Sequence, residues 1–130
     1  MMDTNNNKIN KWSFGIDNDK LIELVLAGKK TATTSNYDPN ELPKIGEKSI
    51  ILFDNGKEAC MVETVNYKVL KFKDIKEDLS NLEGEGPYQK WRIEHINFFK
   101  KYNKDFNDET TVVFEIFKLV KDFSKTPDSN

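Results

Sequence analysis

The segment TTVVFEIFKLV, residues 110–120, decides the fold that we expect for this chain of 130 residues. It is rich in β-branched and aromatic residues, which favour strands. Its apolar residues do not alternate with polar ones, so they would lie on both faces of a strand. Such a strand is covered on both sides, either in the middle of a sheet or in a barrel wall with a helix outside it.

Working outward from this segment, the sequence predicts further strands. The run SIILF, residues 49–53, is a compact strand pattern, and Asn55-Gly56 after it is the strongest short signal for a β-hairpin. The return strand is predicted over about residues 58–70, which is long enough to bend or to carry a β-bulge. The hydroxyl-rich residues 31–35 also favour a strand, because Thr is β-branched.

Two helices and a shorter third are expected around these strands. Residues 17–27 carry an apolar stripe at helical spacing, and Gly28 follows it where a left-handed C-terminal cap is expected. Residues 88–102 place apolar and aromatic side chains on one face, and residues 72–79 predict a short helix. Strands and helices that do not alternate regularly indicate an α+β fold with a small mixed or closed sheet.

The length and composition fit one folded domain. We expect this domain over residues 11–120, with disordered tails at residues 1–10 and 121–130. No apolar run approaches the ~20 residues that cross a membrane, so no membrane partner is expected. The single Cys60 cannot form an intrachain disulfide. That suits a reducing compartment, so we expect a cytoplasmic protein.

The charge of the chain limits its partners. There are 20 Lys+Arg residues against 22 Asp+Glu residues, for a net charge of −2. A protein that holds nucleic acid mainly through phosphates is usually basic, so this balance argues against a general nucleic-acid coat. It permits a local basic pocket, or a ligand no larger than a nucleoside or a short RNA.

Several kinds of chemistry lack the residues that they need. A zinc site takes three or four His, Cys or carboxylate ligands, and the chain has one His and one Cys. We therefore expect no metal. His95 lies on the aromatic face of the second helix, where a packed, hydrogen-bonded histidine is expected rather than a catalytic base. No phosphate-binding loop or dinucleotide fingerprint is present, so no cofactor is expected.

The remaining candidate chemistry is a lysine beside hydroxyl groups, in LAGKKTATTS at residues 26–35. A lysine whose pKa is lowered by burial can take the proton of a hydroxyl and make it a nucleophile. The alternative is that both lysines are solvated at a helix C-terminus, where positive charge is favoured. Residues three apart in a regular strand point to opposite faces. Lys30 and Thr33 would therefore share a pocket only if the backbone turns or bulges between them.

Four blocks of the sequence together resemble the ASCH domain family, and within it the bacterial branch of small single-domain proteins. In chain order they are WSFG at 12–15, GKKTATTS at 28–35, LPKIGEKSIIL at 42–52 and EGEGPYQKWRIEHINFF at 83–99. The resemblance covers about residues 12–120. It implies a PUA-like fold, a small mixed β-barrel flanked by two or three helices with a cleft beside it. It also implies a link to RNA, because PUA domains bind it.

The resemblance further implies a set of catalytic residues. One branch of the family hydrolyses the acetyl amide of N4-acetylcytidine with a lysine, a threonine and a glutamate. Matched residue by residue, these are Lys30, Thr33 and Glu85, with Glu83 as the alternative carboxylate of the same loop. The chain differs from the smaller acetylcytidine enzymes in its WSFG block, its aromatic second helix and Ser35, where they tend to have arginine. These differences leave the substrate open.

Three functions therefore remain in view: an N-acyl nucleoside amidohydrolase, a non-catalytic module that binds RNA or a modified base, and a ribonuclease that uses the same lysine. In each case the ligand is RNA or a nucleoside-like small molecule. Aromatic side chains such as Trp12 and Tyr37 could stack on a base, although core packing explains Trp12 equally well. The residues expected to contact the ligand are Trp12, Lys29, Thr31, Tyr37, Glu83 and Arg92.

Overall fold

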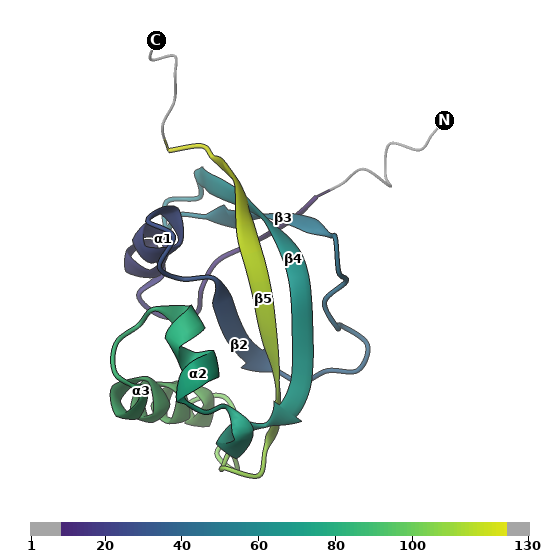
Figure 1. The fold of residues 1–130 in the computed structure, drawn as a ribbon, viewed down its shortest axis with the longest axis vertical. Helices are drawn as coiled ribbons and strands as arrows, with labels where there is room; N and C mark the ends of the chain where they lie inside the picture. Colours follow the sequence, from purple (N-terminus) through teal and green to yellow (C-terminus); the bar gives the residue numbers. More distant parts are fainter. Residues whose placement is uncertain (1–8, 125–130) are drawn as a thin grey trace.

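The computed structural model describes residues 9–124, which form a curled sheet with helices along one side (Figure 1). The strands are β1 (Asn10–Trp12), β2 (Ala32–Asn36), β3 (Lys48–Leu52), β4 (Glu58–Lys71) and β5 (Thr111–Asp122). The helices are α1 (Asn18–Leu26), α2 (Glu77–Ser80) and α3 (Tyr88–Lys100), with short 3-10 turns η2 (Phe72–Asp74) and η3 (Asn81–Glu83). None of the helices in this part of the chain is long and apolar enough to span a bilayer.

The sheet has the order β1-β3-β4-β5-β2, with β1 parallel to β3 and every other pair antiparallel. It curls into a half-barrel, which confirms the expected α+β, PUA-like fold class. β5 lies between β4 and β2, as its apolar residues on both faces predict. β2 is an edge strand of the described sheet, and η3 contacts it.

The hairpin and the long return strand are confirmed. Gly56 has a φ of 88° in the turn between β3 and β4, a conformation that favours glycine. The pairing of β4 with β5 shifts register between Met61 and Val62 and again between Thr64 and Asn66. Such irregularities bend a strand and increase its twist, and they accompany the curl of the sheet.

Three local predictions differ from the structure. β1 was not predicted, because three residues are too few to show a periodic pattern, and its first residue, Asn10, falls in the expected tail. The segment 72–79, expected as one short helix, is divided between the 3-10 turn η2 and the first residues of α2. β5 also continues to Asp122, past the expected end of the domain. The rest of the two expected tails, residues 1–8 and 125–130, lies outside the described residues.

Two hydrophobic clusters hold the helices on the sheet. One is built around α1 and includes Ile22, Val25 and Ile51, and the other is built around α3 and includes Trp91 and Phe114. Gly28 has a φ of 78° just after α1, as its position predicts, and turns the chain towards β2. The connection between α1 and β2 contains Lys30.

Candidate functional site: a buried lysine beside two pockets

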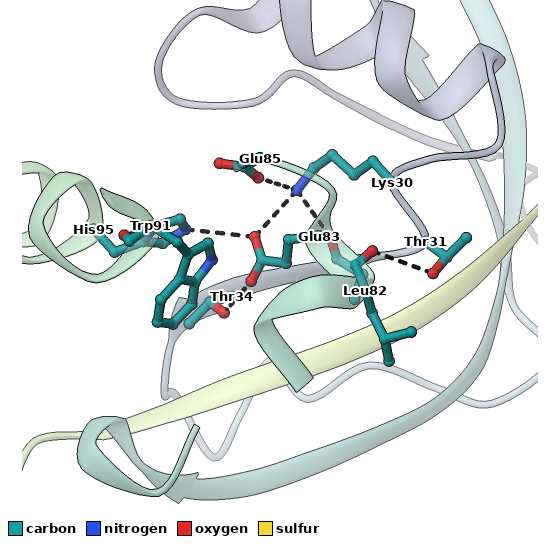
Figure 2. Close-up of polar contacts among 9 residues, drawn as sticks. Lys30, Thr31, Thr34, Leu82, Glu83, Glu85, Trp91 and His95 are labelled. Carbon is teal, nitrogen blue, oxygen red and sulfur yellow. Dashed lines mark hydrogen bonds and ion pairs between the residues drawn. The ribbon is translucent and has the colours of Figure 1, made fainter. Parts of the chain in front are cut away.

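Lys30 is the centre of a buried polar cluster (Figure 2). Its side chain is only 1% exposed. The ammonium group donates to the Ala32 carbonyl oxygen at 2.9 Å, pairs with Glu83 Oε1 at 3.1 Å and contacts Glu85 Oε2. The Nζ atom also lies 5.2 Å from the centroid of the Phe14 ring. A buried charge needs such partners, because desolvation would otherwise make it very costly.

The two glutamates reach Lys30 because their loop packs directly on the backbone before β2. The Thr31 amide and hydroxyl both donate to the Leu82 carbonyl oxygen, at 2.7 and 3.2 Å. Gly84, between the glutamates, has a φ of 67°, and a Cβ atom there would lie 2.2 Å from the Lys29 carbonyl oxygen. Only glycine fits this close approach. Thr31 and Gly84 therefore hold both carboxylates against Lys30.

Glu83 is fully buried and is held from three sides. Besides Lys30, it accepts a 2.6 Å hydrogen bond from the Thr34 hydroxyl and lies 3.4 Å from His95 Nε2. Burial by itself raises the pKa of a carboxyl group. Here Lys30, His95 and Thr34 outweigh burial and lower the pKa of Glu83 to about 2. Glu83 is therefore the stable anion of the cluster.

Glu85 behaves in the opposite way, although it also contacts Lys30. Burial raises its pKa above the usual range, and the nearby charge of Glu83 raises it further, while Lys30 acts in the lowering direction. Two carboxylates that share one site do not ionise with equal ease. Of the two glutamates, Glu85 is thus the one that takes up a proton more readily.

His95 completes the cluster from α3. Its Nδ1 atom lies 2.8 Å from the Trp91 carbonyl oxygen, so Nδ1 carries a proton and donates it. Its ring stacks on Trp91 with the centroids 4.4 Å apart, which confirms a packed, hydrogen-bonded histidine. Burial opposes the charged imidazolium, but the contact with Glu83 outweighs this and raises the pKa of His95. The sequence did not indicate the contact with Glu83.

Lys30 opens onto a pocket of about 430 Å³, here called the lysine pocket. Thr33, Glu83, Glu85 and His95 line the same pocket. β2 begins at Ala32, after Lys30, so the alternation of a regular strand does not apply between Lys30 and Thr33. The Thr33 hydroxyl is half-buried and makes no hydrogen bond within residues 9–124. The two residues therefore share one pocket, and Thr33 is not among the hydrogen-bond partners of the Lys30 ammonium group.

A second pocket, of about 610 Å³, adjoins the first. The two share part of their lining: Phe14, Gly15, Thr33, Thr34 and Phe98. The Phe98 ring packs so closely on Gly15 that a Cβ atom there would lie 2.4 Å from it. Trp12 lines the second pocket, and its indole N–H donates to the Ser49 hydroxyl at 2.9 Å.

The second pocket is also lined by Glu115 of β5, which is not among the site residues expected from the sequence. The Thr64 hydroxyl donates to Glu115 Oε2 at 2.6 Å. Burial raises the pKa of Glu115, and the charge of Glu47 adds to this, while the hydrogen bond from Thr64 acts in the opposite direction. A charged residue in the middle of an apolar strand is the signal by which the sequence could have pointed to Glu115.

Four of the expected ligand-contacting side chains, those of Lys29, Thr31, Tyr37 and Arg92, line neither of these pockets. Lys29 is exposed next to the buried Lys30, and Tyr37 is 41% exposed. Arg92 pairs with Asp108 at 2.8 Å. Thr31 acts on the site through its two hydrogen bonds to the Leu82 carbonyl oxygen. Of the expected ligand contacts, Trp12 and Glu83 lie in a pocket wall.

The carboxylates and the histidine of the cluster also have the composition of a metal site. Ligand atoms of Glu83, Glu85 and His95 lie within 4.8 Å of one another. Lys30 Nζ already contacts both glutamates, however, and supplies the positive charge that a cation would bring. A metal ion bound by all three groups would have to displace this ammonium group.

Comparisons with known proteins agree with this architecture. A family model described as ASCH domain matches residues 10–121. The structure of protein EF3133 from Enterococcus faecalis V583 superposes with a TM-score of 0.80 at 26% identity, over 89% of this chain and 78% of that one. An ASCH domain from Lactobacillus crispatus JV V101 superposes with a TM-score of 0.80 at 25% identity, over 90% of this chain and 83% of that one.

A more distant structure shares the fold alone. A point mutant of ZmASCH from Zymomonas mobilis superposes with a TM-score of 0.54 at 12% identity, over 85% of this chain and 67% of that one. No curated protein matches the sequence significantly.

Proposed function

Because the chain belongs to the ASCH domain family, which is generally RNA-binding, we propose that the lysine pocket is the reaction site at which an N-acyl amide on the base of a nucleoside-like ligand is hydrolysed. One observation carries the proposal. A buried lysine, held between two carboxylates, opens onto a pocket that also exposes an unengaged threonine hydroxyl. A base, a nucleophile and an acid in one pocket are the requirements of acyl transfer.

The size and charge of the pocket favour a small ligand. Its volume of about 430 Å³ falls within the usual range for small-molecule sites. Four lysines line it together with four acidic residues, so its wall is not a strongly basic surface. Such a site suits a small nucleoside-like ligand better than a long RNA that must be held through its phosphates.

In the first step Lys30 acts as the base and Thr33 as the nucleophile. Glu85, which contacts Lys30 and has a raised pKa, takes a proton from the ammonium group and leaves a free amine. The amine then takes the Thr33 proton while the threonine oxygen attacks the acyl carbonyl carbon. Catalytic hydrogen bonds are often absent before substrate binds, so the present separation of Lys30 and Thr33 is compatible with this step.

In the second step the amide bond breaks. Glu85 returns its proton to the leaving amine, and the acyl group stays on Thr33 as an ester. In the hydrolysis of this ester, Glu85 again takes a proton from the Lys30 ammonium group, and the free amine takes a proton from water as the water oxygen attacks the ester carbonyl carbon. The bond between the acyl carbon and the Thr33 oxygen then breaks, Glu85 returns its proton to that oxygen, and the acid is released. Glu83 stays fixed throughout and holds Lys30 in place, because it accepts from Lys30 at 3.1 Å and from the Thr34 hydroxyl at 2.6 Å. His95 in turn supports Glu83.

A binding module without catalysis is the second candidate, and the rim of the lysine pocket favours it. Lys20 and Lys101 line this pocket and form no ion pair within residues 9–124. Lys90 also lines it but is engaged by Glu94 at 2.9 Å. Two free ammonium groups beside a small pocket could hold the phosphates next to one bound base.

Product analysis distinguishes these functions. The protein is incubated with N4-acetylcytidine and, separately, with a short single-stranded RNA, and the products are separated by chromatography. We expect cytidine and acetate from the first substrate and an intact RNA from the second. Lys30→Ala and Thr33→Ala should release no cytidine. Cleaved RNA would instead support the ribonuclease, and two unchanged substrates would leave the binding module as the function.

A further inference from the structure

The second pocket takes no part in the reaction proposed above, yet it meets the lysine pocket at the proposed nucleophile. Thr33 lines both pockets, and so does Phe98. A ligand whose reacting bond lies at Thr33 would therefore have one end in each pocket. The end of the ligand beside Lys30 would lie near Glu83 and Glu85, whose carboxylates already pair with this lysine. The other end meets an acidic wall.

Glu115 lies in that wall next to Thr33. The two residues are directly paired in the antiparallel ladder of β2 and β5. Directly opposite residues of such a ladder point to the same face, with their Cβ atoms about 4.5–5.5 Å apart. Thr34, by contrast, pairs with Phe114 on the other face of the sheet, towards α3. Glu115 is thus the acidic neighbour of Thr33 on the side of the second pocket.

The Glu115 side chain has one oxygen fixed and one free. Thr64 holds Oε2 at 2.6 Å, while Oε1 has no hydrogen-bond partner within the described part of the chain. The charged groups around it are mostly acidic as well. Glu41 and Glu47 line the same pocket, with Lys44 as its one cation, and all three are exposed. The pocket thus offers an oriented acceptor in acidic surroundings.

We propose that the second pocket is the subsite for the nucleobase and that Glu115 selects bases with an exocyclic amino group. This inference rests on the proposed nucleoside-directed function and names its ligand class. A carboxylate oxygen accepts a hydrogen bond from the amino group of cytosine, and it repels the carbonyl oxygen that uracil has at the same position. Trp12 and Phe98 supply the aromatic lining on which a base can stack.

Binding of unmodified nucleosides tests this assignment without depending on catalysis. Cytidine and uridine are titrated into the wild-type protein, Glu115→Gln and Glu77→Gln, and the affinities are measured by calorimetry. Glu77 is exposed in α2 and lines neither pocket, so its variant is the matched control. In Glu115→Gln, Thr64 can donate to the amide oxygen, which leaves an amide NH₂ group facing the ligand.

We expect the wild type and Glu77→Gln to bind cytidine roughly tenfold more tightly than uridine. Glu115→Gln should lose this preference or reverse it, with an unchanged unfolding midpoint. A preference that persists in Glu115→Gln, or that is absent from the wild type, would overturn the assignment. Amide chemical shifts of Thr33 and Glu115 provide a second readout, because both should move when cytidine is added.

The outcome is separable from that of the proposed function. If N4-acetylcytidine is hydrolysed but the base preference does not depend on Glu115, the hydrolase stands and the subsite fails. If no hydrolysis occurs but the Glu115-dependent preference is found, the subsite stands and the catalytic proposal fails.

Discussion

Lys30 Nζ lies 3.1 Å from Glu83 Oε1 across 53 positions of sequence, with 1% of the lysine and none of the glutamate exposed. A buried ion pair of this kind is costly to form, and removing one partner leaves the other charge without compensation. The pair therefore ties the α1–β2 connection to the loop before α3. It also means that a loss of activity in a Lys30 variant does not by itself show a catalytic role.

Replacing Lys30 by methionine should destabilise the fold strongly. The change leaves Glu83 buried without its main partner, and the expected loss is about 3–5 kcal/mol in the free energy of unfolding. Urea denaturation followed by circular dichroism measures it. The double variant Lys30→Met/Glu83→Gln should recover most of the loss, because no unpaired charge remains at this contact. A double variant as unstable as the single one would contradict the ion-pair account.

The two glutamates should differ in their effect on stability, although both contact Lys30. Glu83→Gln removes a strongly stabilised anion and should lower the free energy of unfolding near pH 7. Glu85→Gln removes a carboxyl group whose burial raises its pKa, so its ionisation opposes folding and the variant should be as stable as the wild type or more stable. Equal losses in the two variants would show that the glutamates are not distinguished in this way.

Acid should weaken the contribution of Glu83 to the free energy of unfolding over a defined range of pH. Its folded-state pKa of about 2 is below the ordinary value of 4.5, so the stabilisation is fully present above about pH 4.5 and is lost as the pH falls towards about 2. The measurement is the difference in unfolding free energy between the wild type and Glu83→Gln across this range. The difference should shrink steadily on acidification; a constant difference is the contrary result.

His95 gives a direct readout of the same cluster, since it is the one histidine of the chain. Its pKa should lie above the ordinary value of 6.5, because Glu83 stabilises the imidazolium. The stabilisation is therefore present below about pH 6.5 and is lost as the pH rises through the folded-state pKa. NMR titration of the imidazole measures this. In Glu83→Gln the pKa of His95 should fall. An equal His95 pKa in the wild type and in this variant would exclude the contact between His95 and Glu83.

Gly84 should not tolerate a side chain. Gly84→Ala places a Cβ atom 2.2 Å from the Lys29 carbonyl oxygen at a φ of 67°, so the loop has to move away from Lys30. We expect the free energy of unfolding to fall by about 1–3 kcal/mol, and the pKa of His95 to shift. Gly46→Ala is the matched control, because Gly46 has a φ of 89° and no atom within 4 Å of the added Cβ position. Equal losses of stability in the two variants would show that backbone strain alone causes the effect, without the close approach to Lys29.

Much of the fold could be predicted from local patterns. The apolar segment of β5, the Asn55-Gly56 turn and Gly28 after α1 each carry a strong physical signal, and the structure confirms all three. β1 could not be predicted, because its three residues are held by parallel pairing with β3 rather than by their own pattern.

The site was harder to predict, because its contacts join distant segments. Lys30 and both glutamates were identified through the family resemblance, and they are in contact. Thr34 and His95 were missed as partners of Glu83, since no sequence spacing relates β2, η3 and α3. Arg92 has the residue type that binds phosphates, but its partner Asp108 lies in the segment before β5, which no local pattern connects to α3.

The most direct test of the central claim is the rate of cytidine release from N4-acetylcytidine by Thr33→Ala. Thr111→Ala is the matched control, because Thr111 is exposed in β5 and lines neither pocket. The account predicts that the wild type and Thr111→Ala release cytidine at similar rates. Thr33→Ala should be at least about 1,000-fold slower, with an unfolding midpoint equal to that of the wild type. A wild type that releases no cytidine, or a Thr33→Ala variant as fast as the wild type, would contradict it.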